Sequence, residues 1–265
     1  MKKYLFIFKN HLLSMLEYRS ELVASAVNQL ISFGVVIVLW LAVFRTNSSV
    51  AGYSFGQMAL YYLLIPFIGL LTQVQLSAKV GFEIKDGLLS SSLLKPFAIW
   101  LGYLMRALAQ CFYRLAILLP FYVILTVILF KALGGFKLDG SSVLIALLLA
   151  MAGFMMHFFL DLCICWLSFW AGDVWSFQHF KSITFGILGG VSFPFEFLPS
   201  TMQTVFNILP FKFLFYVPLA YVLGKRGIAD LPMDCFQLGL WILFFAVLSA
   251  AFWKKGVKVY EAYGN

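Results

Sequence analysis

Apolar segments of membrane-spanning length follow one another along the chain and leave little room for anything else. The first two run from about Leu22 to Phe44 and from about Gln57 to Ala78. A helix needs about 20 mainly apolar residues to cross the hydrocarbon core of a bilayer. Because 63% of the 265 residues are hydrophobic and only 11% are charged, the chain lacks the polar surface of a soluble domain. The sequence therefore predicts an all-α, polytopic membrane protein with a single transmembrane domain.

Six spans are predicted in total, and the other four cover approximately residues 100–130, 143–170, 183–197 and 236–253. The fifth is short and rich in glycine and proline. Residues 195–223 are then divided by Pro210 and Pro218 into pieces too short to span. Short pieces at membrane depth are tolerated where they pack inside protein, so we interpret them as re-entrant helices that enter from outside. The alternative is that Phe211 to Leu223 completes a span, which would reverse the last segment.

Two amphipathic segments are predicted to lie at the membrane surface. Residues 1–20 carry an apolar stripe opposite Lys2 and Lys9, which is typical of an interfacial helix. Residues 83–97, called the foot below, form a charged interruption between two apolar segments and are predicted to contain one or two short helices. We interpret the foot as the cytoplasmic surface on which a soluble partner acts.

The distribution of basic residues orients the chain. Lys and Arg gather on the predicted inner side, including Lys254, Lys255 and Lys258 after the last span. This bias places both termini in the cytoplasm of a multi-pass protein of the cell membrane. It also accounts for the net charge of +8, so nucleic acid is not expected as a partner.

The sequence favours neither a nucleotide site nor a hydrolytic site. It lacks the G-x-x-x-x-G-K-[ST] loop that cradles phosphates, and its four cysteines have no zinc or disulfide spacing. We therefore expect no catalytic residue and no metal ligand in this chain.

A few polar residues inside the predicted spans are candidates for function. Asp161 and Arg114 lie at similar depth in neighbouring spans, so we predict that they form an ion pair. His157 lies one helical turn from Asp161 and could relay a proton with it. Both patterns are also typical of buried structural contacts. Outside the spans, Glu196 lies between Pro194 and Pro199 and is a candidate outer gate, although a solvated loop carboxylate is the simpler interpretation.

With these features in view, the chain resembles the permease subunit of a type-2 ATP-binding-cassette (ABC) exporter of the daunorubicin-resistance-like branch. The resemblance covers nearly the whole chain. It rests on the interfacial helix, the foot, the prolines at 194, 199 and 210, and the tail from Trp253 to Gly264 with its motif from Tyr260 to Gly264. The foot residues that carry it are Glu83, Lys85, Asp86, Gly87, Lys95 and Pro96.

The resemblance implies how such a protein works. Two separate ATPase subunits would hold ATP and Mg and contact the foot and the interfacial helix. A second permease chain, identical or homologous, would complete the transporter within the lipid. The pair would export an amphipathic drug, lipid, glycan or peptide by alternating access.

Two other classes of function remain open at this point. A proton-coupled secondary transporter using Asp161 and His157 would be built from internal repeats with matching broken helices. The sequence shows only one such broken region, between residues 183 and 223. A membrane-embedded enzyme or assembly factor would need more converging polar residues than His157 and Asp161.

Overall fold

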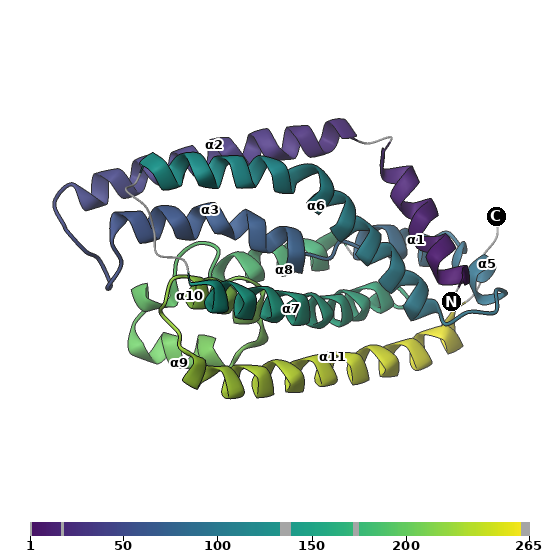
Figure 1. Cartoon of the computed structure of the whole chain (residues 1–265). Coiled ribbons are helices and arrows are strands. Elements are labelled where there is room, and N and C mark those ends of the chain that lie inside the picture. Colours follow the sequence, from purple (N-terminus) through teal and green to yellow (C-terminus); the bar gives the residue numbers. More distant parts are fainter. Residues whose placement is uncertain (1, 17–18, 133–138, 172–174, 261–265) are drawn as a thin grey trace.

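The computed structural model describes residues 2–16, 19–132, 139–171 and 175–260, and this part of the chain is almost entirely helical (Figure 1). Its α-helices are α1 (Lys2–Met15), α2 (Arg19–Phe44), α3 (Phe55–Thr72), α4 (Ser77–Lys85), α5 (Leu89–Leu93), α6 (Ile99–Ala132), α7 (Gly140–Leu167), α8 (Trp175–Leu188), α9 (Ser200–Ile208), α10 (Tyr216–Val222) and α11 (Leu231–Val259). Three short 3-10 helices are η2 (Phe195–Phe197), η3 (Pro210–Leu214) and η4 (Ile228–Asp230).

Among the described residues, five helical stretches are long and apolar enough to cross a membrane: Ala26–Phe44, Phe55–Lys85, Ile99–Ile128, Gly140–Leu167 and Ile228–Val259. The predicted all-α membrane protein is confirmed at this level. The predicted fifth span has different bounds, because α8 begins at Trp175 and ends at Leu188. With 14 residues, α8 is shorter than the ~20 that a bilayer crossing needs.

The long helices run side by side, α8 lies between the two ends, and several short helices gather at the ends of the bundle (Figure 1). One end carries α1 and α5, together with the start of the chain and the end of α11. The opposite end carries α9 and α10. We call these the α1 end and the α9 end.

Helix α7 lies at the centre and packs against α3, α10 and α11. Small residues allow this close approach, as is common between helices in membranes. At Gly153, an added Cβ would lie 2.8 Å from the carbonyl oxygen of Phe213, so any larger residue would push η3 away. On the side of α11, Trp166 Nε1 donates a hydrogen bond of 2.9 Å to Ser249 Oγ. The core is thus centred on α7.

The region from 195 to 223 forms η2, α9, η3 and α10, as the prediction of short helices required. Residues 211–223 do not form one continuous helix, because the chain is broken at Phe215 between η3 and α10. In α10 every residue from Tyr216 to Tyr221 is buried, whereas α9 has no buried residue. Pro210 follows closely after the end of α9, whereas Pro218 lies inside α10, which ends at Val222.

A buried charged cluster fastens this region to the start of α11. Arg226 Nη1 lies 2.5 and 2.6 Å from the two carboxylate oxygens of Asp234, and Lys212 Nζ lies 3.9 Å from the same group. Tyr221 donates to Asp234 as well, over 3.0 Å. Asp234 is thus the shared partner of Lys212 and Arg226, which no pattern in the sequence predicts.

Candidate functional site

The second spanning stretch is interrupted in its interior. Helix α3 ends at Thr72, α4 begins at Ser77, and the backbone at Gln73 is extended, with φ −76° and ψ 131°. Proline and glycine within a span favour a bend, but α3 runs through both Pro66 and Gly69. Since a bilayer offers no water, the backbone groups freed by this break must be satisfied by other parts of the protein. We call residues 73–76 the helix break.

Asp161 of α7 closes the start of α4. Its carboxylate accepts hydrogen bonds from the backbone N–H of Leu76 at 2.8 Å and of Ser77 at 3.2 Å, and from Ser77 Oγ at 3.1 Å. Lys181 of α8 donates to the same carboxylate over 2.5 Å. A carboxylate at a helix N-terminus satisfies the free N–H groups and is favoured by the helix dipole. Asp161 therefore caps α4 from a neighbouring helix.

Three further side chains hold the remaining backbone groups of the helix break. Arg114 of α6 donates over 2.5 Å to the carbonyl oxygen of Gln73, and Lys181 lies 3.4 Å from that of Val74. His157 Nδ1 lies 2.8 Å from the carbonyl oxygen of Thr72 and 3.2 Å from Val74 N. Side chains from α6, α7 and α8 thus converge on one short piece of backbone.

The predicted ion pair between Arg114 and Asp161 is wrong. Both residues reach the helix break, but in the described part of the chain the only cation within ion-pair distance of Asp161 is Lys181. The helical rise along each span predicts that Arg114 and Asp161 lie at the same depth. It does not show that the helix break lies between them. The missed partner, Lys181, is the one Lys or Arg residue of α8, which is the signal that could have found it.

The predicted relay between His157 and Asp161 is also wrong as a direct contact. Each side chain is hydrogen-bonded to the backbone or side chains of residues 72–77 instead, and neither bonds to the other. His157 Nε2 is buried and has no hydrogen-bond partner. The two residues share a role in holding the helix break.

The candidate outer gate lies at the α9 end. Glu196 is not a solvated loop carboxylate, because it is half-buried and accepts a hydrogen bond of 2.9 Å from the Tyr216 hydroxyl. Pro194 is buried and precedes η2, while Pro199 is exposed and precedes α9. Burial, and next the charge of Glu196, raise the pKa of the nearby Tyr53 hydroxyl far above its usual range. Pro194, Glu196 and Pro199 thus lie in one region of the α9 end.

The foot lies at the α1 end and divides into inward-facing and exposed residues. Glu83 faces inward, where it accepts from Arg106 at 2.6 Å and from the Tyr103 hydroxyl at 2.9 Å. Gly87 adopts a φ of 73°, a conformation that favours glycine, and this turn separates α4 from α5. The exposed predicted residues are Lys85, Asp86, Lys95 and Pro96.

Contacts from both ends of the chain support the foot. Lys3 of α1 donates to the carbonyl oxygen of Pro96, and the backbone N–H of Ala98 donates to the Tyr4 hydroxyl at 3.1 Å. The Tyr260 hydroxyl, just after α11, lies 3.2 Å from Ser90 Oγ. Tyr260 opens the predicted tail motif, and the rest of that motif lies outside the described residues.

The packing of helix α1 on α6 includes a histidine and is therefore most stable near neutral pH. His11 Nε2 lies 3.5 Å from Gln110 Nε2 of α6. Burial, then the positive charges of Lys79 and Arg106, lower the pKa of His11 from 6.5 to about 4, with Glu83 acting in the opposite direction. Release of α1 therefore takes up a proton between pH 6.5 and 4. The docking of α1 is complete above pH 6.5 and weakens as the pH falls toward 4.

Hydrogen exchange tests this dependence. Amides of α1 are expected to exchange faster at pH 5 than at pH 7.5, after correction for the intrinsic rate. The variant His11→Gln keeps a polar side chain that does not titrate, so its corrected exchange is expected to be the same at both values. Equal pH sensitivity in the variant and the original chain would contradict this role.

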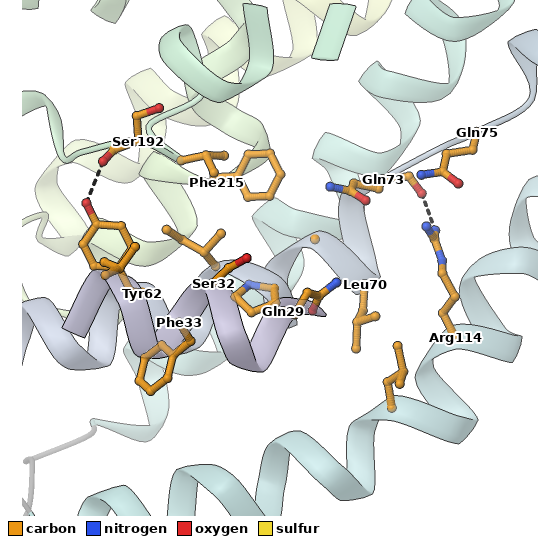
Figure 2. A pocket seen from close by; sticks show the side chains of 16 residues that line it. Gln29, Ser32, Phe33, Tyr62, Leu70, Gln73, Gln75, Arg114, Ser192 and Phe215 are labelled. Carbon is orange, nitrogen blue, oxygen red and sulfur yellow. Dashed lines mark hydrogen bonds between the residues drawn. The ribbon is translucent and has the colours of Figure 1, made fainter. Parts of the chain in front are cut away.

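A cavity of about 570 Å³ lies beside the helix break (Figure 2). Its walls come from α2, α3, α6, the helix break, and the chain after α8. Figure 2 shows Arg114, Gln73 and Gln75 at one end, and Tyr62 and Ser192 at the other. The Tyr62 hydroxyl donates to the carbonyl oxygen of Ser192 at 2.6 Å. The cavity therefore runs from the polar helix break along α2 and α3 to the contact between Tyr62 and Ser192.

Comparison with known proteins identifies the class to which this arrangement belongs. The family model of the ABC-2 family transporter proteins matches residues 30–264, which is most of the chain. The comparisons with curated proteins and with solved structures give no match.

The chain belongs to the ABC-2 transporter family and is a multi-pass membrane protein, a permease component of an ABC transporter. Permeases of this family generally work with ATPase subunits. The predicted recognition is confirmed at the level of the family.

Proposed function

We propose that this chain is the permease subunit of an ATP-driven exporter in the cell membrane, of the daunorubicin-resistance-like branch. Two separate ATPase subunits hold ATP and Mg, and a second permease chain, identical or homologous, completes the pathway. The transporter moves an amphipathic substrate, such as a drug, lipid, glycan or peptide, out of the cytoplasm by alternating access. The observation that carries this proposal is the foot, an exposed surface tied to the spanning helices of a chain in the ABC-2 family.

In this proposal the α1 end is cytoplasmic and α1 lies on the inner leaflet. The fifth of the six spans consists of α8 and the chain that follows it, with residues 195–223 re-entrant from the outer side. The distribution of Lys and Arg supports this orientation, since Lys254, Lys255 and Lys258 lie near the end of α11, at the α1 end.

The foot offers an ATPase both charge and apolar surface. Besides its exposed charged residues, it exposes Leu88 by 59% and Leu94 by 87%, in the two turns that flank α5. Exposed apolar side chains beside charges are typical of protein contact sites. A push on this surface reaches α6 through Glu83 and Arg106, and reaches the helix break through α4.

Charge reversal at the foot tests this coupling. Asp86→Lys is expected to lower ATP-driven transport by about tenfold, the effect of ~1.4 kcal/mol. ATP hydrolysis is expected to continue, because no residue of the ATPase is changed. The measurement is transport into inside-out vesicles, with hydrolysis followed in the same sample. Arg45→Glu, an exposed reversal just after α2 near the α9 end, is the matched control and is expected to transport normally.

Two results would contradict the proposal. One is that purification in mild detergent recovers the chain without any ATPase while transport is complete. The other is transport that stops when an uncoupler collapses the proton gradient but continues without ATP.

A further inference from the structure

The cavity beside the helix break has polar groups clustered at its Arg114 end and a mainly apolar wall that leads from there to Tyr62 and Ser192. Along α3 it extends from Tyr62 to Gln73, a helical rise of ~16 Å. Gln29, Gln73 and Gln75 provide amide groups near Arg114, and the rest of the wall is mainly apolar. The apolar lining comprises Phe33, Val36, Ile65, Leu70, Leu118 and Phe215. This shape suits one head group and one apolar tail.

Arg114 is the only charged residue among the 16 that line the cavity. Its guanidinium makes one hydrogen bond, from Nη2 to the carbonyl oxygen of Gln73. Its Nε is buried and has no hydrogen-bond partner. Within the described ranges, no carboxylate lies within 4.0 Å of Arg114, so its charge is not neutralised by the protein.

Among the described residues, three other carboxylates that reach into the bundle have an ion-pair partner, whereas Glu196 accepts a hydrogen bond from the Tyr216 hydroxyl instead. Asp161 is matched by Lys181, Asp234 by Arg226, and Glu83 by Arg106. A buried cation without a counter-ion is costly, and in a membrane protein it is by default a functional site. The unpaired charge of Arg114 therefore indicates that the neutralising anion comes from a ligand in the cavity.

The surrounding groups fit an anion that accepts several hydrogen bonds. Guanidinium binds carboxylate and phosphate oxygens with paired donors. Gln29 accepts from the Tyr122 hydroxyl through Oε1, which leaves its NH₂ available as a donor. No carboxylate lines the wall to repel such a group.

We propose that this cavity binds single-chain amphipathic anions, with a phosphate, sulfate or carboxylate head group at Arg114 and the apolar tail between α2, α3 and Phe215. This inference deepens the proposed function, on which it rests, because it names the class of substrate that the exporter carries. The cationic amphiphiles carried by many drug exporters are excluded by the charge of Arg114.

Binding to the full chain without ATPase subunits tests the proposal. The purified protein is placed in phosphatidylcholine nanodiscs, and radiolabelled dodecyl phosphate and dodecyltrimethylammonium are compared as probes of equal tail length. The original chain is expected to bind the anion at least about tenfold more tightly than the cation. Failure to bind dodecyl phosphate, or equal binding of both probes, would overturn the proposal.

Variants at the polar end and at the apolar wall of the cavity separate the head group from the tail. Arg114→Gln is expected to remove the preference for the anion, while Arg45→Gln, the same change at an exposed position, leaves it intact. Val36→Trp fills the space beside the apolar wall and is expected to weaken binding of both probes about equally. An anion preference that survives in Arg114→Gln would overturn the proposal.

A second head-group variant covers the case in which Arg114→Gln does not fold. Arg114→Lys keeps the charge but not the paired donors, so it is expected to prefer the anion with a several-fold weaker affinity. Loss of the preference in a folded Arg114→Lys would overturn the assignment of the head group to this charge.

The composition of the nanodisc distinguishes a cargo from a bilayer lipid. Adding phosphatidylglycerol is expected to leave the affinity for dodecyl phosphate unchanged, because its second acyl chain does not fit a single-tail cavity. Competition by phosphatidylglycerol would show that a membrane lipid occupies the site and would overturn the cargo assignment. The ATPase is absent from these measurements, so an exporter that fails to recruit one would refute the proposed function without altering the binding result.

Discussion

Asparagine in place of Asp161 is expected to be the most damaging conservative substitution in the chain. The variant keeps the shape of the side chain but removes its negative charge, which neutralises Lys181. It also replaces the carboxylate that accepts three hydrogen bonds from Leu76 and Ser77. Breaking a buried ion pair by removing one partner costs about 3–5 kcal/mol. We expect a fall of many degrees in the apparent melting temperature in detergent, together with loss of the monodisperse fraction.

The companion variants show whether the charge or the hydrogen bonds dominate. Removing both charges, in Asp161→Asn with Lys181→Met, leaves no unpaired ion and is expected to recover part of the loss. Asp86→Asn, an exposed carboxylate at the foot, is the control and is expected to melt like the original chain. A double variant less stable than Asp161→Asn alone would contradict the ion-pair explanation.

The sequence was sufficient to predict the class of the protein and most of its long helices. Hydropathy alone located α2, α6 and α7 to within about three residues at each end, and α11 less closely, because spanning helices must be long, apolar and internally hydrogen-bonded. It also located the foot and the short helices between 195 and 223, where proline and glycine end a helix by known local rules.

The helix break could not be predicted in the same way. Residues 73–76 contain neither glycine nor proline, and Pro66 lies inside an unbroken helix. The break exists because Asp161, His157, Arg114 and Lys181 satisfy its backbone groups from three other helices. Such compensation is a property of tertiary packing, which depth estimates along single helices do not contain. For the same reason Asp161 was assigned the wrong cation.

The foot shows the same division between local and tertiary information. Its exposure and charge could be predicted from the sequence, but the inward direction of Glu83 could not. Glu83 and the exposed Asp86 are three residues apart, and only the fold shows that Glu83 holds α4 against α6 while Asp86 lies on the contact surface. We call the contact between Glu83 and Arg106 the brace. This distinction gives the two carboxylates different expected phenotypes: Asp86 affects recognition of the ATPase, whereas Glu83 affects transmission into α6.

Charge reversal at the brace is therefore expected to uncouple transport from ATP hydrolysis without preventing ATPase binding. Glu83→Arg places two cations together beside Tyr103, and Arg106→Glu places two carboxylates there. A charge-assisted hydrogen bond of this kind contributes about 1.5–3 kcal/mol. Each single variant is expected to retain ATPase binding but to lose ten- to a hundred-fold in transport per ATP hydrolysed, by the usual conversion of free energy.

The double reversal, Glu83→Arg with Arg106→Glu, is the decisive measurement. It restores opposite charges across the 2.6 Å contact between α4 and α6 and is expected to recover most of the transport lost in either single variant. Recovery would show that the contact itself transmits the movement of the foot, because the double variant has neither original side chain in place. If the double variant is as defective as the singles while its melting temperature is normal, Glu83 acts instead through direct contact with the ATPase.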